Sequence, residues 1–199
     1  MPSKLKNLRR RVARFLLRES DISERLKQAE RQLRQNTKTL SGLRLLMAMA
    51  PADLSSLTAE MGRSKSQYWQ DLFVLGQLGM KRNGYFVDFG ATDGVRLSNT
   101  YLLERAYGWT GIAAEPARCW HDRLRANRRC HIETKCVWKK SGEMVAFNET
   151  PAAVLSTVAS FTASDLHAPR RANGTIHDVE TISLLDLLQK YNAPPGELA

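Results

Sequence analysis

Long hydrophobic runs are missing from this sequence. The longest, residues 45–50, is far shorter than the roughly 20 apolar residues that cross a bilayer, and no signal peptide is recognisable. We therefore expect a cytoplasmic protein. Peripheral attachment to a membrane remains an alternative, because the first 18 residues are basic and amphipathic.

Cysteine is scarce and odd in number, with only Cys119, Cys130 and Cys136. This argues against a disulfide framework and for a reducing compartment. No C-x-x-C pair is present, and Cys119 and His121, two residues apart, would not share a helix face. We expect no metal site.

Two nucleotide-binding motifs are also missing, the phosphate-binding G-x-x-x-x-G-K-[ST] and the dinucleotide fingerprint G-x-G-x-x-G. Instead, residues 85–94 read Tyr-Phe-Val-Asp-Phe-Gly-Ala-Thr-Asp-Gly. This pattern predicts a buried strand that ends near Asp88 and leads into a turn containing Gly90 and Gly94. Such a turn at the end of a strand in an α/β sheet is typical of a nucleotide-like ligand site, although it also occurs as a plain turn.

A second short apolar strand, residues 110–114, ends at Glu115 and Pro116. Glu115 follows the glycine turn by roughly the 20 residues at which nucleotide-binding folds place the acid that binds ribose hydroxyls. The alternative is that Glu115 caps the following helix.

Four ordered motifs, residues 66–71, 87–94, 98–104 and 111–116, together resemble an FkbM-type S-adenosylmethionine (SAM)-dependent methyltransferase. The resemblance covers about residues 64–192. It implies a Rossmann-like class I methyltransferase sheet that binds SAM and methylates a hydroxyl of a small molecule, a sugar or glycan, or a natural product. It also implies the cofactor-binding residues Gln67, Gln70, Asp71, Asp88, Gly90, Ala91, Thr92, Asp93, Gly94, Ser98, Asn99, Glu115, Pro116, Val137 and Trp138.

The resemblance also implies roles for these residues. Residues 90–94 would wrap the methionine end of SAM, and Glu115 would hold its ribose. Gln67, Gln70 and Asp71 would close over the cofactor from a helix before the first strand. Val137 and Trp138, after a third strand at 132–137, would lie near the adenine. No catalytic residue is identified.

In this family a fourth strand ending in an Asp-x-Glu-Gly type motif follows a helix like residues 183–191, whereas residues 193–199 contain no such strand. We therefore expect an incomplete sheet, the front half of a catalytic domain. The alternative function is an inactive methyltransferase-like protein that acts through its N-terminal extension in assembly or membrane attachment.

Between the third strand and that helix the sequence predicts a hairpin of residues 143–148 with 154–158, then a sheet segment at 179–182. Residues 167–175 are polar and basic and read as a solvated loop. Asp165, Arg170 and Arg171 are candidates for contact with the acceptor, but solvation is favoured.

We expect three parts: a basic helical extension (1–50), a linker (51–65) and the methyltransferase part (66–199). The extension holds 13 Lys or Arg against 4 Asp or Glu. Its apolar residues recur at alternating three- and four-residue steps, which is typical of a coiled coil. Asp21 and Glu24 form a candidate capping box at which the helix would restart. The seam consists of Leu5, Leu8, Val12, Phe15, Ile22, Leu26, Ala29, Leu33, Leu40, Leu43 and Met47, with Glu19 and Asn36 as polar members.

The partners of the extension are left open between a second copy of the chain, the methyltransferase part and an anionic membrane. The first 18 residues are basic and amphipathic without a compensating acid, which suits a membrane surface or a solvated coiled-coil face. Because no aromatic residues interleave with these cations, we do not expect nucleic-acid binding.

Overall fold

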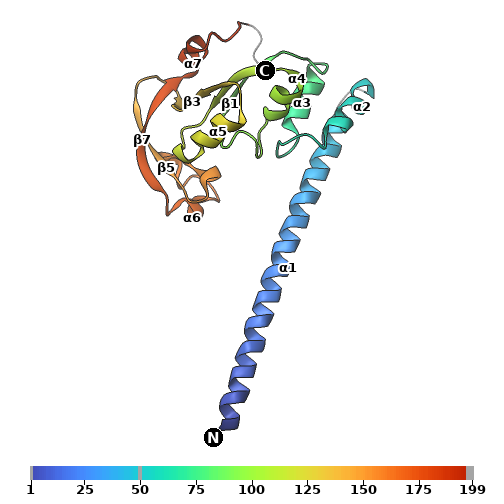
Figure 1. Cartoon of the computed structure of the whole chain (residues 1–199), viewed down its shortest axis with the longest axis vertical. Helices are drawn as coiled ribbons and strands as arrows, with labels where there is room; N and C mark the ends of the chain where they lie inside the picture. The colour runs from blue at the N-terminus through green and yellow to red at the C-terminus, as the bar shows by residue number, and fades with distance from the viewer. Residues whose placement is uncertain (1, 49–50, 196–199) are drawn as a thin grey trace. The chain divides into compact units, whose positions relative to one another are not determined.

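The computed structural model describes residues 2–48 and 51–195, and the chain divides into two compact units, Met1–Ala48 and Met49–Ala199 (Figure 1). The boundary between them lies well before residue 66, where the sequence placed the start of the second part. Each unit is described by itself.

The first unit is one helix, α1 (Pro2–Ala48). Proline stands only at its first position, where a missing N–H costs nothing, and leucine, arginine, glutamine and glutamate, all good helix formers, are frequent in it. The predicted helix is confirmed, but the predicted restart at Asp21 is wrong, since α1 is continuous there. Side chains before residue 21 lie outside those described, and with them the expected membrane contact of the first 18 residues.

The predicted linker is wrong, because residues 51–65 contain helix α2 (Pro51–Glu60). Leu57 of α2 is fully buried. Helix α3 (Gln70–Gln77) follows, and Trp69 before it has a left-handed backbone with φ of 58°. Gln67 therefore precedes α3 instead of lying on it. The burial of Leu57 makes α2 part of the folded second unit.

The centre of the second unit is a parallel sheet in the order β1 (Tyr85–Phe89), β2 (Thr110–Ala114), β3 (His131–Glu133). Helix α4 (Tyr101–Tyr107) connects β1 to β2, and η1 (Arg118–Trp120) with α5 (His121–Asn127) connects β2 to β3. Strand–helix–strand crossovers of this kind are what a Rossmann-like fold requires. The α/β class and the first two strands are as predicted.

The remaining strands form a second, mixed sheet in the order β4–β7–β5–β6. β4 (Cys136–Trp138) pairs parallel with β7 (Thr175–Ser183), whereas β5 (Met144–Glu149) pairs antiparallel with both β7 and β6 (Thr157–Val158). The single strand expected at 132–137 is thus wrong. It divides after Glu133, whose side chain accepts hydrogen bonds from the amides of Thr134 and Lys135.

The predicted hairpin is confirmed by the pairing of β5 with β6. Short helices η2 (Ala153–Leu155), η3 (Ala159–Phe161) and α6 (Ala168–Arg171) lie around β6, and α7 (Leu184–Lys190) follows β7 with Ser183 as its N-cap. The solvated loop expected at 167–175 is wrong for Arg171. This side chain is buried, forms an ion pair with Asp165 at 2.9 Å and donates to the Leu155 carbonyl.

The parallel sheet is covered on both faces. Tyr85 and Ile112 pack with Leu187 of α7, whereas Ala113, the next residue of β2, packs with Leu124 of α5. Because successive residues of a strand point to opposite faces, α5 and α7 cover opposite sides of the sheet. Because both faces are covered, a ligand can reach the sheet only at the ends of its strands.

Candidate functional site

The carboxyl ends of β1 and β2 are joined directly. The amides of Gly90 and Ala91 both donate to the carbonyl of Ala114, at 2.8 and 3.2 Å. The turn that follows β1 is thereby held beside the end of β2, where open α/β sheets bind their ligands.

Gly90 has an unusual position in this turn. Its φ is +73°, which favours glycine, and a Cβ built on it would meet nothing within 4 Å. Glycine is therefore favoured by the backbone here, and its missing side chain leaves open space next to the chain. Thr92, two residues later, also has positive φ, at 49°. Non-glycine residues in this conformation are uncommon and cluster at functional sites.

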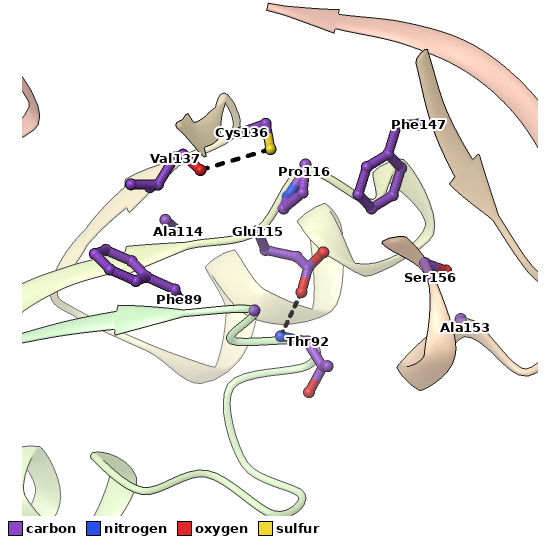
Figure 2. Close-up of a pocket in the computed structure, with 11 residues that line it drawn as sticks. Phe89, Thr92, Ala114, Glu115, Pro116, Cys136, Val137, Phe147, Ala153 and Ser156 are labelled. Atoms are coloured by element: carbon purple, nitrogen blue, oxygen red, sulfur yellow. Dashed lines mark hydrogen bonds between the residues drawn. The ribbon is translucent and has the colours of Figure 1, made fainter. Parts of the chain in front are cut away.

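Glu115, at the end of β2, connects this turn to the start of the next helical segment. Its Oε2 accepts from the Thr92 amide at 2.8 Å (Figure 2). Its Oε1 accepts from the Ala117 amide, also at 2.8 Å. The side chain is 4 % exposed, and burial raises its pKa despite these two bonds. Glu115 thus binds the amide of Ala117, the residue that precedes η1, and also lines the space beside Gly90.

A hollow of about 180 Å³ lies beside Glu115. Figure 2 shows Glu115 between β1 and β2 on one side and Phe147 with residues of the η2 segment on the other. The wall is mostly apolar, and Glu115 is its charged group. The hollow is lined by Phe89, Gly90, Thr92, Ala114, Glu115, Pro116, Cys136, Val137, Phe147, Ala153 and Ser156.

A second hollow of about 180 Å³ shares Phe89, Gly90 and Thr92 with the first. Its acid is Asp88, which accepts a 2.6 Å hydrogen bond from the Thr100 hydroxyl and whose pKa is raised by burial. The rest of the lining comes from the segment before α4 and from η2. The remaining residues are Ala91, Arg96, Leu97, Ser98, Asn99 and Val154.

Arg128, just after α5, holds the turn that follows β1 through side-chain hydrogen bonds. Its side chain is fully buried and pairs with Glu104 at 2.8 Å. It also donates to the Gly94 carbonyl and to the Thr100 hydroxyl, the group that donates to Asp88. Gly94 itself faces this arginine, because a Cβ there would lie 2.5 Å from the Arg128 Cγ. Gly94 therefore packs against the protein and not against either hollow.

Several residues implied by the resemblance lie away from both hollows: Gln67, Gln70, Asp71, Asp93, Gly94 and Trp138. Asp93 Oδ1 accepts from the amides of residues 95 and 96, and Gln70 Oε1 accepts from the Tyr68 amide. Trp138 contacts Phe161 edge-on. These contacts stabilise local structure.

Asp71 is fully buried and accepts from the hydroxyls of Ser64 and Ser66, each at 2.8 Å. Burial raises its pKa. Ser66 in turn bridges Leu97, a residue of the second hollow. Asp71 thus holds the segment 64–66 in place, and this segment contacts the second hollow through Leu97.

Sequence reasoning placed nine of its residues at the two hollows: Asp88, Gly90, Ala91, Thr92, Ser98, Asn99, Glu115, Pro116 and Val137. It missed Phe89, Arg96, Leu97, Ala114 and Cys136, and also Phe147, Ala153, Val154 and Ser156, although it predicted the hairpin that carries the last four. Two segments separated by a proline-containing turn predicted the hairpin, but nothing in the sequence showed that this turn faces the ends of β1 and β2.

No family model, curated protein or solved structure matches this chain. Within the described ranges, no three His, Cys, Asp or Glu side chains are grouped to hold a metal ion, and none of the described helices has the length and apolar character to cross a membrane.

Proposed function

We propose that residues 49–199 carry the cofactor site of a SAM-dependent methyltransferase of the FkbM type, acting on a hydroxyl of a sugar, glycan or natural product. One observation carries this proposal: two hollows adjoin at Gly90, at the carboxyl ends of two parallel strands, and each contains one acid whose pKa is raised by burial, Glu115 in the first and the half-buried Asp88 in the second. An apolar hollow joined to one that also holds Asp88, Arg96, Ser98 and Asn99 suits a ligand that combines a nucleoside with a charged amino acid.

The residues present fit such a ligand. In the first hollow Phe89, Val137 and Phe147 would contact the adenine, and Glu115 would accept hydrogen bonds from the ribose. Each Glu115 oxygen accepts one amide hydrogen bond and retains a second acceptor site. In the second hollow Asp88 and the segment 96–99 would hold the amino-acid end. Bound SAM supplies an electrophilic methyl group on its sulfonium.

The contribution of the chain to the reaction would be alignment and the exclusion of water. Gly90 lets the cofactor approach the backbone closely, because no Cβ occupies that space. Val154, from the hairpin, lines the second hollow and would limit the approach of the acceptor. The proposal assigns no side chain as general base.

A second candidate is a methyltransferase-like protein without catalysis that acts in assembly or membrane attachment. The exposed apolar side chains of α1 favour it, because they need a covering partner. SAM binding and methyl transfer would distinguish the two candidates.

The binding test is calorimetry with SAM on the whole chain. Gly90→Ala should weaken binding about tenfold or more, equal to about 1.4 kcal/mol, because its Cβ would enter the space between the hollows. Gly142→Ala is the matched control, since Gly142 also has positive φ (+79°) and open space around it but lines neither hollow. It should bind SAM like the wild type.

Glu115→Ala should cost about 1.5–3 kcal/mol of SAM binding through the lost charged acceptor. Its fold must be checked by circular dichroism, because the Thr92 and Ala117 amides lose their partner. Equal affinity in the folded wild type, Gly90→Ala and Glu115→Ala proteins would contradict the cofactor site. Binding without transfer of labelled methyl to glycan or small hydroxylated acceptors would favour the second candidate.

A further inference from the structure

One face of α1 is apolar and exposed. Among the side chains of α1 that are described, which begin at residue 21 and exclude residues 43, 45, 46 and 48, Ile22, Leu26, Leu33, Leu40 and Met47 are each more than half exposed. Exposed residues of this size in a single stripe are a liability unless a partner covers them. At 1.5 Å per residue α1 is about 70 Å long, which is long enough for a partner to cover the stripe along many turns.

The spacing of this stripe is that of a coiled coil. The steps from Ile22 to Met47 alternate between four and three residues without interruption, and the pattern continues toward the N-terminus to Leu5. A stripe of period 3.5 stays on one side of a supercoiled helix, whereas packing on a globular surface requires a period of 3.6 and a wider stripe. The regular seven-residue repeat therefore favours a second long helix as the partner.

The charges beside the stripe favour a parallel partner. In this repeat Arg25 lies at a g position and Glu30 at the following e position, and these two positions face each other across a parallel, in-register pair. The other flanking pairs from residue 21 on, Gln32 with Thr37 and Thr39 with Arg44, contain no like charges. An antiparallel pair would instead align g with g positions and would separate Arg25 from Glu30.

Asn36 favours the same register. It is the one polar residue of the stripe from residue 21 on. In register, the two copies of Asn36 meet and can share hydrogen bonds, whereas any shift places an amide against an apolar residue.

We propose that α1 pairs with α1 of a second copy of this chain as a parallel, in-register, two-stranded coiled coil. Leu26, Leu33, Leu40 and Met47 form its a positions, and Ile22, Ala29 and Asn36 lie at d positions. Each dimer contains two Arg25–Glu30 pairs.

The first test is sedimentation equilibrium of the whole chain. The wild type should be a dimer at micromolar concentration, and Leu33→Gln with Leu40→Gln should make it a monomer. The matched control, Lys27→Gln with Arg34→Gln, changes two exposed residues on the outer face and should stay dimeric. A monomeric or trimeric wild type, or a dimer unchanged by the Leu33 and Leu40 substitutions, would overturn the proposal. So would a monomer that pellets with anionic phosphatidylserine vesicles, which would assign the stripe to a membrane.

The second test addresses direction and register. Leu26→Cys and Leu40→Cys, each alone, should give disulfide-linked dimers under mild oxidation, because equivalent a positions meet only in a parallel, in-register pair. The control Arg31→Cys lies on the outer face and should not cross-link above the wild-type background. Absence of cross-linking at either seam position in a dimeric protein would refute the parallel arrangement.

A charge exchange provides an independent check. Arg25→Glu should raise the dimer dissociation constant at least about threefold, since two attractive pairs become repulsive. Adding Glu30→Arg should restore the wild-type value. Failure of the second substitution to restore it would contradict the contact between these two positions.

Discussion

Arg128 provides the sharpest test of how the second unit is held together. Its guanidinium is fully buried and donates to the Glu104 carboxylate at 2.8 Å, the Gly94 carbonyl at 3.1 Å and the Thr100 hydroxyl at 2.9 Å. It also lies over the ring of Phe86, 5.3 Å from the ring centroid. The perturbation is Arg128→Met, which keeps much of the apolar stem and removes the charge and the donors.

The expected loss in the free energy of unfolding depends on the groups that Arg128→Met leaves buried. Glu104 is only 7 % exposed, so the substitution leaves a buried carboxylate with the Arg129 amide as a remaining partner. Removing one member of a buried ion pair costs about 3–5 kcal/mol, mainly through the uncompensated charge of the other. That is a large part of the roughly 5–15 kcal/mol that stabilises an ordinary domain. We expect the lower end of this range, because Arg129 still solvates one oxygen.

A second substitution separates the buried charge from the lost packing. Glu104→Gln in the Arg128→Met background removes the carboxylate charge while keeping an acceptor for Arg129. If the charge is the main cause, the double variant should be more stable than the sum of the two single effects predicts. We expect a coupling free energy of about 1–3 kcal/mol.

The assay is urea unfolding followed by tryptophan fluorescence, with free energies of unfolding from linear extrapolation. The control is Arg125→Met on α5, where the ion pair with Asp122 is long, at 3.8 Å, and the arginine is 55 % exposed. This control should change stability by less than about 0.5 kcal/mol. Additive single effects, or a loss at Arg128 no larger than at Arg125, would show that the buried Glu104 charge is not the main cause of the instability. Arg128→Lys replaces Arg128→Met if the latter has no folded baseline.

Two further predictions concern the sheet. Gly111→Ala should destabilise the fold by about 2 kcal/mol or more, because its Cβ would overlap the Phe86 carbonyl and ring, whereas Gly62→Ala has open space and should be neutral in the same unfolding assay. Burial raises the pKa of Glu133, but the hydrogen bonds from Lys190 and nearby amides outweigh it and hold the pKa below its usual 4.5. Glu133 therefore stabilises the fold above that pH, and the contribution is lost as pH falls through the lowered value. Glu133→Gln should cost about 1–3 kcal/mol at pH 7, and a cost that does not shrink in acid would contradict this.

The central strands could be predicted from the sequence because two signals agreed. Tyr85 to Phe89 is an apolar run with a glycine turn after it, and Glu115 follows at the spacing of a strand–helix–strand unit. These features are local, so they can be read from neighbouring residues. The β5–β6 hairpin was predictable for the same reason.

The errors arose where a side chain contacts residues that no local pattern reveals. The amide hydrogen bonds of Glu133 end β3 within a run of residues that reads as one strand. Arg171 looks solvated in a basic segment, yet an ion pair six residues away and two carbonyls hold it in the interior. The resemblance implied that Asp71 closes over the cofactor, but its carboxylate accepts hydrogen bonds from the hydroxyls of Ser64 and Ser66.

The segment between β5 and β7, residues 150–174, begins and ends at neighbouring positions of the sheet. Glu149 and Thr175, at its two ends, are paired neighbours across the two strands, and Arg171 ties its interior together. A segment with adjoining ends can be lengthened, shortened or replaced without displacing the strands that hold it. Residues 150–174 are therefore a natural cassette: grafting a different segment there would reshape the walls contributed by Ala153, Val154 and Ser156, while the ends of β1 and β2 stay as they are.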